Sequence, residues 1–133
     1  MIDKHLPNYL RHLRSRRRFT KKGIAEKLHE KYPFWAHSTI RRYISRFEGS
    51  MRGLNWEVKT QPFGTLFCLY VDLLEPEDRE RDKIVAKLNC GDFELKPDSA
   101  YLQHIGRTYI NKLEEKLTLA RSAMLSYKEN DVT

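Results

Sequence analysis

Residues 20–49 read TKKGIAEKLHEKYPFWAHSTIRRYISRFEG, and this stretch decides the fold because it contains two helical patterns joined by an apolar, aromatic link. In the first pattern Thr20 precedes a segment with Ile24 and Leu28 on one face, so its hydroxyl predicts a helix N-cap. Pro33 predicts the end of that helix, because a proline disfavours helical conformation in the residue before it. The stretch therefore predicts two consecutive helices separated by a turn.

The second pattern, STIRRYISRFEGS, combines an apolar face with a basic one. Ile40, Ile44 and Phe47 fall on one helical face. Ser38 is expected to cap this helix, and Gly49 is expected to end it. The opposite face holds Arg41, Arg42, Ser45 and Arg46. Such a surface suits a helix lying in a DNA groove, and it equally suits an ordinary amphipathic helix with a solvated basic face.

The flanking segments add further helical patterns. Apolar residues at helical spacing predict a helix over about residues 4–18, and the acidic segment EPED, 75–78, predicts the start of another. The apolar run of residues 64–74 permits a buried helix or a buried strand, and its leucine spacing favours the helix. The alternation in residues 55–63 permits one short strand.

A long apolar stripe marks the C-terminal part, where it advances in steps of three and four residues from Leu102 to Tyr127. The stripe is too long for a small domain to bury, so this helix is expected both to pack along residues 64–88 and to pair with a second copy. Its average step of about 3.6 residues does not predict an extended coiled coil. The residues expected to carry self-association are Leu102, Ile105, Tyr109, Leu113, Leu117 and Met124.

Positive charge is concentrated in the first part of the 133-residue chain. Residues 1–53 contain 14 lysines and arginines against 4 acidic residues, and the remaining 80 residues contain 11 against 14. This asymmetry indicates an N-terminal part that meets a polyanion. Charge and helical patterns together predict an all-α protein. Residues 1–74 would form a helix-turn-helix domain of three to five helices, and residues 75–133 a helical oligomerisation region.

The sequence contains no clear signal of an enzyme, a metal-binding protein, a membrane protein or a secreted protein. The five histidines are scattered, no cysteine pair has metal-ligand spacing and no glycine-rich phosphate loop is present. Asp72 with Glu94 and Lys96 matches nuclease spacing only loosely, so we expect no enzyme, cofactor or metal. No apolar run is long enough for a membrane span, and no secretory signal opens the chain. A cytoplasmic, nucleoid-associated protein with a buried, reduced Cys68 is expected.

Two segments resemble a known family. LRHLRSRRRFTKKGIAEKL resembles the opening of the Xre/Cro-type helix-turn-helix regulators, and YISRFEGSMRGLN resembles the stretch that closes their recognition helix. The resemblance covers about residues 6–55, with a longer segment between Ala25 and Ile40 than that family usually has. It implies a DNA-binding regulator of the kind found in bacteria, phages and mobile elements. The long turn itself is either a packing insert or a loop that reaches DNA.

The chemistry of DNA contact names the candidate residues. A helix start such as the one after Thr20 offers backbone N–H groups to a phosphate, and the head of a recognition helix normally enters the major groove. Arginine can bridge two acceptors of guanine, and serine can serve several bases. The candidate contacts are Thr20, Lys21, Lys22, His37, Ser38, Thr39, Arg41, Arg42, Ser45 and Arg46, to which the resemblance adds Arg52 as a backbone contact. The basic run Arg14, Arg16, Arg17 and Arg18 is either a phosphate clamp or a solvated helix end.

These features predict a sequence-specific, double-stranded DNA-binding transcriptional regulator of repressor type. A homodimer would match half-sites about 34 Å apart, or a multiple of that distance. One alternative is a DNA-binding adaptor in packaging, replication or partition, which would form larger assemblies. The other is a protein-interaction module that blocks a nucleic-acid machine, which would show no preference among DNA sequences.

Overall fold

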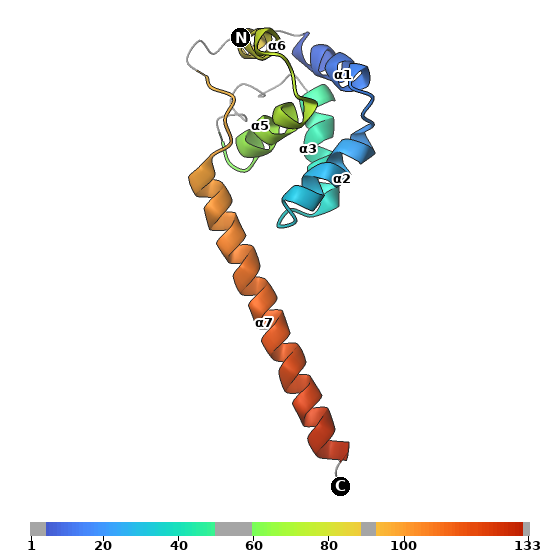
Figure 1. Cartoon of the computed structure of the whole chain (residues 1–133), viewed down its shortest axis with the longest axis vertical. Helices are drawn as coiled ribbons and strands as arrows, with labels where there is room; N and C mark the ends of the chain where they lie inside the picture. Colours follow the sequence, from blue (N-terminus) through green and yellow to red (C-terminus); the bar gives the residue numbers. More distant parts are fainter. Residues whose placement is uncertain (1–4, 50–59, 89–92, 132–133) are drawn as a thin grey trace.

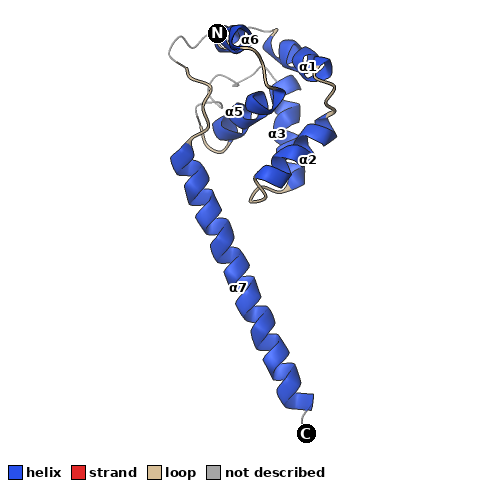
Figure 2. Cartoon of the chain, in the orientation of Figure 1, coloured by secondary structure: helices blue, strands red, loops and turns tan. Residues whose placement is uncertain are grey.

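The computed structural model describes residues 5–49, 60–88 and 93–131, and every regular element in these ranges is a helix (Figure 1, Figure 2). Five of these helices form a head, from which the last one projects (Figure 1). The elements are α1 Leu6–Arg16, α2 Lys21–Lys31, α3 His37–Gly49, α5 Phe63–Leu74, α6 Asp78–Lys87 and α7 Ser99–Asp131. The predicted all-α fold is confirmed.

The first two helices form where the sequence predicts them. Pro7 lies in the first turn of α1, where its missing N–H has no helical partner to lose, and Leu10 and Leu13 are buried. The Thr20 hydroxyl accepts a hydrogen bond from the Gly23 N–H at 2.9 Å. The predicted N-cap of α2 is therefore confirmed.

The link between α2 and α3, residues 32–36, is a packed aromatic segment. Trp35 is buried, and its carbonyl oxygen lies 2.8 Å from Nδ1 of His29, so the link is fixed to the last turn of α2. The rings of Phe34 and Trp35 contact edge to face with centroids 4.7 Å apart. Tyr32 and Phe34 also pack against the core. The long turn is thus a packing insert.

The start of α3 differs from the sequence-based expectation. The Ile40 N–H donates to the Ala36 carbonyl oxygen at 3.1 Å, so the helix already begins at His37 and Ser38 lies inside its first turn. The predicted cap at Ser38 is therefore wrong. Gly49 is the last residue described for α3 and residue 50 lies outside the described ranges, so the helix end at Gly49 stays a prediction.

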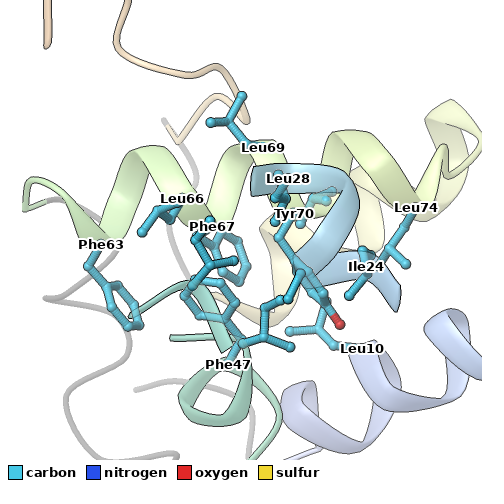
Figure 3. Packing of buried hydrophobic residues seen from close by; sticks show 14 of the residues in the cluster. Leu10, Ile24, Leu28, Phe47, Phe63, Leu66, Phe67, Leu69, Tyr70 and Leu74 are labelled. Carbon is cyan, nitrogen blue, oxygen red and sulfur yellow. The ribbon is translucent and has the colours of Figure 1, made fainter. Parts of the chain in front are cut away.

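Helix α5 is the centre of the head. It is buried around nearly its whole circumference, as expected for a helix that is apolar on all sides, and this decides the helix against the strand for residues 64–74. Figure 3 shows Phe47 of α3 beside Phe63 and Phe67 of α5, and the ring centroids are 4.8 and 5.1 Å apart. Of the possible strand over 55–63, residues 55–59 lie outside the described ranges and residues 60–62 form a turn.

Helix α6 belongs to the head. Ile84 and Leu88 are fully buried in the same core as α1, α3 and α5, so the predicted domain boundary after residue 74 cuts through this core. Glu75, expected at the start of the helix, instead ends α5 in a left-handed conformation with φ 49°. The start of α6 is supported by Glu77, whose N–H donates to the Glu80 carboxylate at 3.4 Å.

Helix α7 is the long C-terminal helix that the stripe predicts, and at 33 residues it is about 50 Å long. Asp98 caps it, because its Oδ1 accepts a hydrogen bond from the Tyr101 N–H at 3.1 Å. Only its first turns pack on the head, and the rest extends away (Figure 1). None of the helices in the described ranges combines the length and apolarity that crossing a membrane requires.

Candidate nucleic-acid interface

The outer face of α3 is the main candidate surface. Ile40, Ile44 and Phe47 are at most 1% exposed, and their burial fixes the opposite face of the helix toward the outside. That face presents Ser38, Arg41, Arg42, Ser45 and Arg46, all of which are exposed. At 3.6 residues per turn, Ser38, Arg42 and Ser45 lie directly opposite the core, with Arg41 and Arg46 at the two sides.

The electrostatics of this face are uniformly positive or neutral. The only acidic residue of α3 is Glu48, which is 1% exposed and points into the head. Among the described residues, neither Arg41 nor Arg42 forms an ion pair with a carboxylate. The Arg46 guanidinium lies 5.1 Å from the centre of the Phe63 ring, which holds one side of the face in place.

The N-terminus of α2 is a second candidate contact. Thr20 and Lys22 are exposed, and Lys21 is half-buried. The Thr20 oxygen is used to cap the Gly23 N–H, and the hydroxyl hydrogen remains able to donate to a phosphate. The first N–H groups of a helix have no intrahelical acceptor, so they add to the positive end of the helix dipole there.

Two residues at the head of α3 are less accessible than predicted. His37 is half-buried, and its Nε2 is enclosed without a hydrogen-bond partner in the described structure. Its ring meets that of His29 edge to face with centroids 6.1 Å apart. Thr39 is also half-buried. The Nε2 atom of His37 is therefore turned inward, and its contact with DNA stays a prediction.

Arg14 is not available to a phosphate, because it pairs with Glu48 inside the head. Nη2 of Arg14 lies 2.9 Å from Glu48 Oε1, and the exposed fractions of the two side chains are 12% and 1%. Nη1 of Arg14 donates to the Phe19 carbonyl oxygen at 2.8 Å, and the Tyr70 hydroxyl donates to Glu48 Oε2 at 3.0 Å. Burial and the neighbouring Glu48 charge raise the pKa of Tyr70, so its hydroxyl stays a donor. The prediction of a phosphate clamp is wrong for Arg14.

The other members of the basic run lie at the end of α1. Arg16 pairs with the Glu80 carboxylate of α6, and Arg17 donates to the Glu75 carbonyl oxygen at 2.8 Å. These two arginines therefore attach α1 to the α5–α6 corner. Arg18 is exposed, with a left-handed backbone at φ 61°, and stays a candidate phosphate contact. Arg52, the remaining DNA-contact candidate, lies outside the described residues.

The residues predicted for self-association divide into two groups. Leu102, Ile105 and Tyr109 are half-buried, and the Tyr109 ring lies 6.3 Å from Phe34, so this group attaches α7 to its own head. The second group is exposed by 45 to 62% and consists of Leu113, Leu117 and Met124. The first group is thus partly used by the head and the second group is not, and self-association stays a prediction for both.

Sequence reasoning missed one residue of the core and one of the exposed α7 surface. Glu48 lies four residues after Ile44 on the buried face of α3, and that spacing is the signal that could have identified it as a partner for a buried arginine. Ile110 is 53% exposed beside the stripe of α7 and was also missed. In the described part of the chain, no group of three or more histidine, cysteine or acidic residues could hold a metal ion.

No protein-family model, curated protein or solved structure matches the chain. The Xre/Cro-type resemblance therefore stays a prediction.

Proposed function

We propose that the chain is a sequence-specific, double-stranded DNA-binding regulator of repressor type, in which α3 is the recognition helix. The observation that supports the proposal is the outer face of α3, where exposed arginines and serines stand opposite a buried apolar face. No acidic side chain of α3 shares that face. A polyanion with polar base edges is the partner that such a surface fits.

Each part of the surface has a role that its chemistry suits. Arg42, at the centre of the face, can donate two hydrogen bonds to guanine, and Ser38 and Ser45 can bond several bases. Lys21 and Lys22, with the free N–H groups of the α2 start, would contact phosphates and fix the register. Base-reading and phosphate-binding groups would then come from consecutive helices.

Self-association through α7 is the second part of the proposal. Leu113, Leu117 and Met124 are exposed on one face of a helix that the head leaves uncovered. A homo-oligomer would present two copies of α3, and a two-fold symmetric protein reads an inverted repeat.

Selection of bound fragments from a random duplex pool tests the proposal. At about 0.15 M salt, which weakens nonspecific electrostatic binding, we expect enrichment of an inverted repeat. Binding that disappears at this salt without enriching any sequence would contradict the proposal and indicate a solvated or protein-docking face.

Point variants then test the assignment of α3. Arg42→Ala is expected to weaken binding to the selected site by about 1–3 kcal/mol and to relax the preference at one base position. Arg79→Ala is the matched control, because Arg79 is an exposed arginine on α6, away from α2 and α3. Equal affinity of both variants and the parent would show that α3 does not read bases.

A further inference from the structure

The exposed half of α7 is an apolar surface that the head does not use. Most of α7 extends away from the head (Figure 1). From Ile110 onward its large apolar side chains are 45 to 73% exposed. Their spacing of three and four residues keeps most of them on one face, which includes Leu113, Leu117, Met124 and Tyr127.

We infer that α7 pairs with the α7 of a second copy in antiparallel orientation, with the two-fold axis between Thr118 and Leu119. This inference rests on the proposed self-association and adds its orientation and register. The exposed stripe runs from Ile110 to Tyr127, and an antiparallel pair that covers all of it must be centred at its midpoint.

The position of the head favours this orientation over a parallel one. Leu102, Ile105 and Tyr109 attach the head to the beginning of the same stripe that continues, exposed, from Leu113. In a parallel pair in register the two helices would run about 8–10 Å apart. Because each head packs on the stripe side of its own helix, the two heads would then overlap in the space between the helices. In the antiparallel pair, Tyr109 faces position 128 of the partner subunit, and the last helical position, 131, faces Gly106. The partner helix therefore passes Tyr109 but stops before Ile105 and Leu102, which attach α7 to the head.

The apolar side chains complement one another in this register. Ile110 faces Tyr127 of the partner subunit, and Leu113 faces Met124 of the partner subunit. Near the axis, Leu117 faces Ala120 of the partner subunit, so a large side chain meets a small one. The two-fold axis repeats each contact.

The charges beside the stripe select the same orientation. Glu114 and Arg121 are seven residues apart and flank the stripe on one side, whereas Lys116 flanks it on the other. In an antiparallel pair equal flanks meet, which brings Glu114 within a turn of Arg121 of the partner subunit. In a parallel pair opposite flanks meet, and Lys116 would face Arg121 of the partner subunit with like charge. Both arrangements occur twice by symmetry.

Antiparallel pairing sets the distance between the two DNA-reading helices. With the axis at the stripe midpoint, the two α7 start points lie about 60 Å apart at 1.5 Å per residue. The heads are then at opposite ends of a rod. Two half-sites about two turns of duplex apart, about 68 Å, fit this arrangement better than adjacent half-sites.

Distance measurements between paired spin labels test the orientation without DNA, so the result does not depend on the proposed DNA binding. Labels are placed at Ala100→Cys or Ser122→Cys, both exposed positions, in a Cys90→Ser chain whose Cys68 is buried. We expect a mass twice 15.9 kDa, a distance of about 55 Å at position 100 and one below about 30 Å at position 122. A dimer with short distances at both positions would overturn the antiparallel orientation, and a monomer at all concentrations would overturn the pairing.

Charge reversal provides an independent test. Arg121→Glu places like charges together in the antiparallel pair, and we expect about tenfold weaker dimerisation, which Glu114→Lys in the same chain restores. In a parallel pair Arg121→Glu would instead face Lys116 and tighten the dimer, which would overturn the inference. Glu115→Lys is the control for Glu114→Lys, because Glu115 lies on the face of α7 opposite the stripe and should leave dimerisation unchanged.

Discussion

At the scale of single residues, the head depends on a buried charge pair whose two residues look exposed from the sequence alone. Arg14 belongs to a run of arginines and Glu48 to a basic helix, yet the two meet inside the core with Tyr70. A charge pair at this depth adds little when complete, because desolvation offsets the attraction. Removing only one partner of the pair leaves the other charge buried and uncompensated, which is strongly unfavourable.

Glu48→Gln is therefore expected to lower the free energy of unfolding by about 3 kcal/mol, since it leaves the Arg14 charge buried without its counter-ion. Urea unfolding at neutral pH measures the change. Asp72→Asn is the matched control, because its 3.5 Å pair with Arg81 is exposed and should contribute less than about 1 kcal/mol. Equal effects of the two variants would show that the buried pair has no special role.

Two ionisable groups in α5, a thiol and a phenol, make the free energy of unfolding depend on pH. Burial raises the pKa of the Cys68 thiol to about 11, and burial with the Glu48 charge raises the pKa of Tyr70. A raised pKa means that the folded state keeps its proton while the unfolded chain ionises, so this stability is full below pH 9 and is lost as pH rises toward 11.

We expect the free energy of unfolding to fall by about 1–2 kcal/mol between about pH 9 and 11, as measured by urea unfolding. Cys68→Ala should reduce this dependence, because it removes the group that ionises first. An equally steep decline in the variant would assign the effect to other groups.

At the scale of elements, the cap of α2 joins local stability to the candidate phosphate contact. Thr20→Ala removes the acceptor of the Gly23 N–H, so we expect a loss of about 1 kcal/mol in thermal or urea unfolding. Thr20→Ser keeps the acceptor and should stay within a few tenths of the parent. A serine variant as unstable as the alanine variant would place the effect in the threonine methyl group.

Most elements could be predicted from the sequence because local signals determine them. Thr20 before the Ile24–Leu28 pattern and the leucines of α5 each specify a helix without reference to distant residues. Two errors are local, the cap expected at Ser38 and the helix start expected at Glu75. The other errors concern contacts made at long range. Arg14 meets Glu48 across 34 positions, and Arg16 meets Glu80 across 64. Tyr109 of α7 meets Phe34 of the link between α2 and α3. The sequence shows which residues are charged or apolar, but the tertiary fold determines which residues they contact.

At the scale of the whole molecule, the head and the exposed part of α7 are separable. The described core lies in residues 6–105, and the side chains described from Ile110 to Tyr127 are all exposed. A chain that ends at Asn111 should therefore keep the urea midpoint of the full chain's head and be monomeric. A large fall of that midpoint would show that the removed residues stabilise the head.

The same truncation separates the contribution of one head to DNA binding from that of two. Each head would neutralise its own set of phosphates, and the slope of log affinity against log salt is about −0.9 per phosphate neutralised on duplex DNA. The truncated chain should therefore bind a single half-site with about half the salt slope that the full chain shows on the paired site. Titrations of both chains from about 0.05 to 0.3 M salt measure the slopes. Equal slopes would mean that only one head of the pair contacts DNA, so the rod would join a DNA-bound head to a free one.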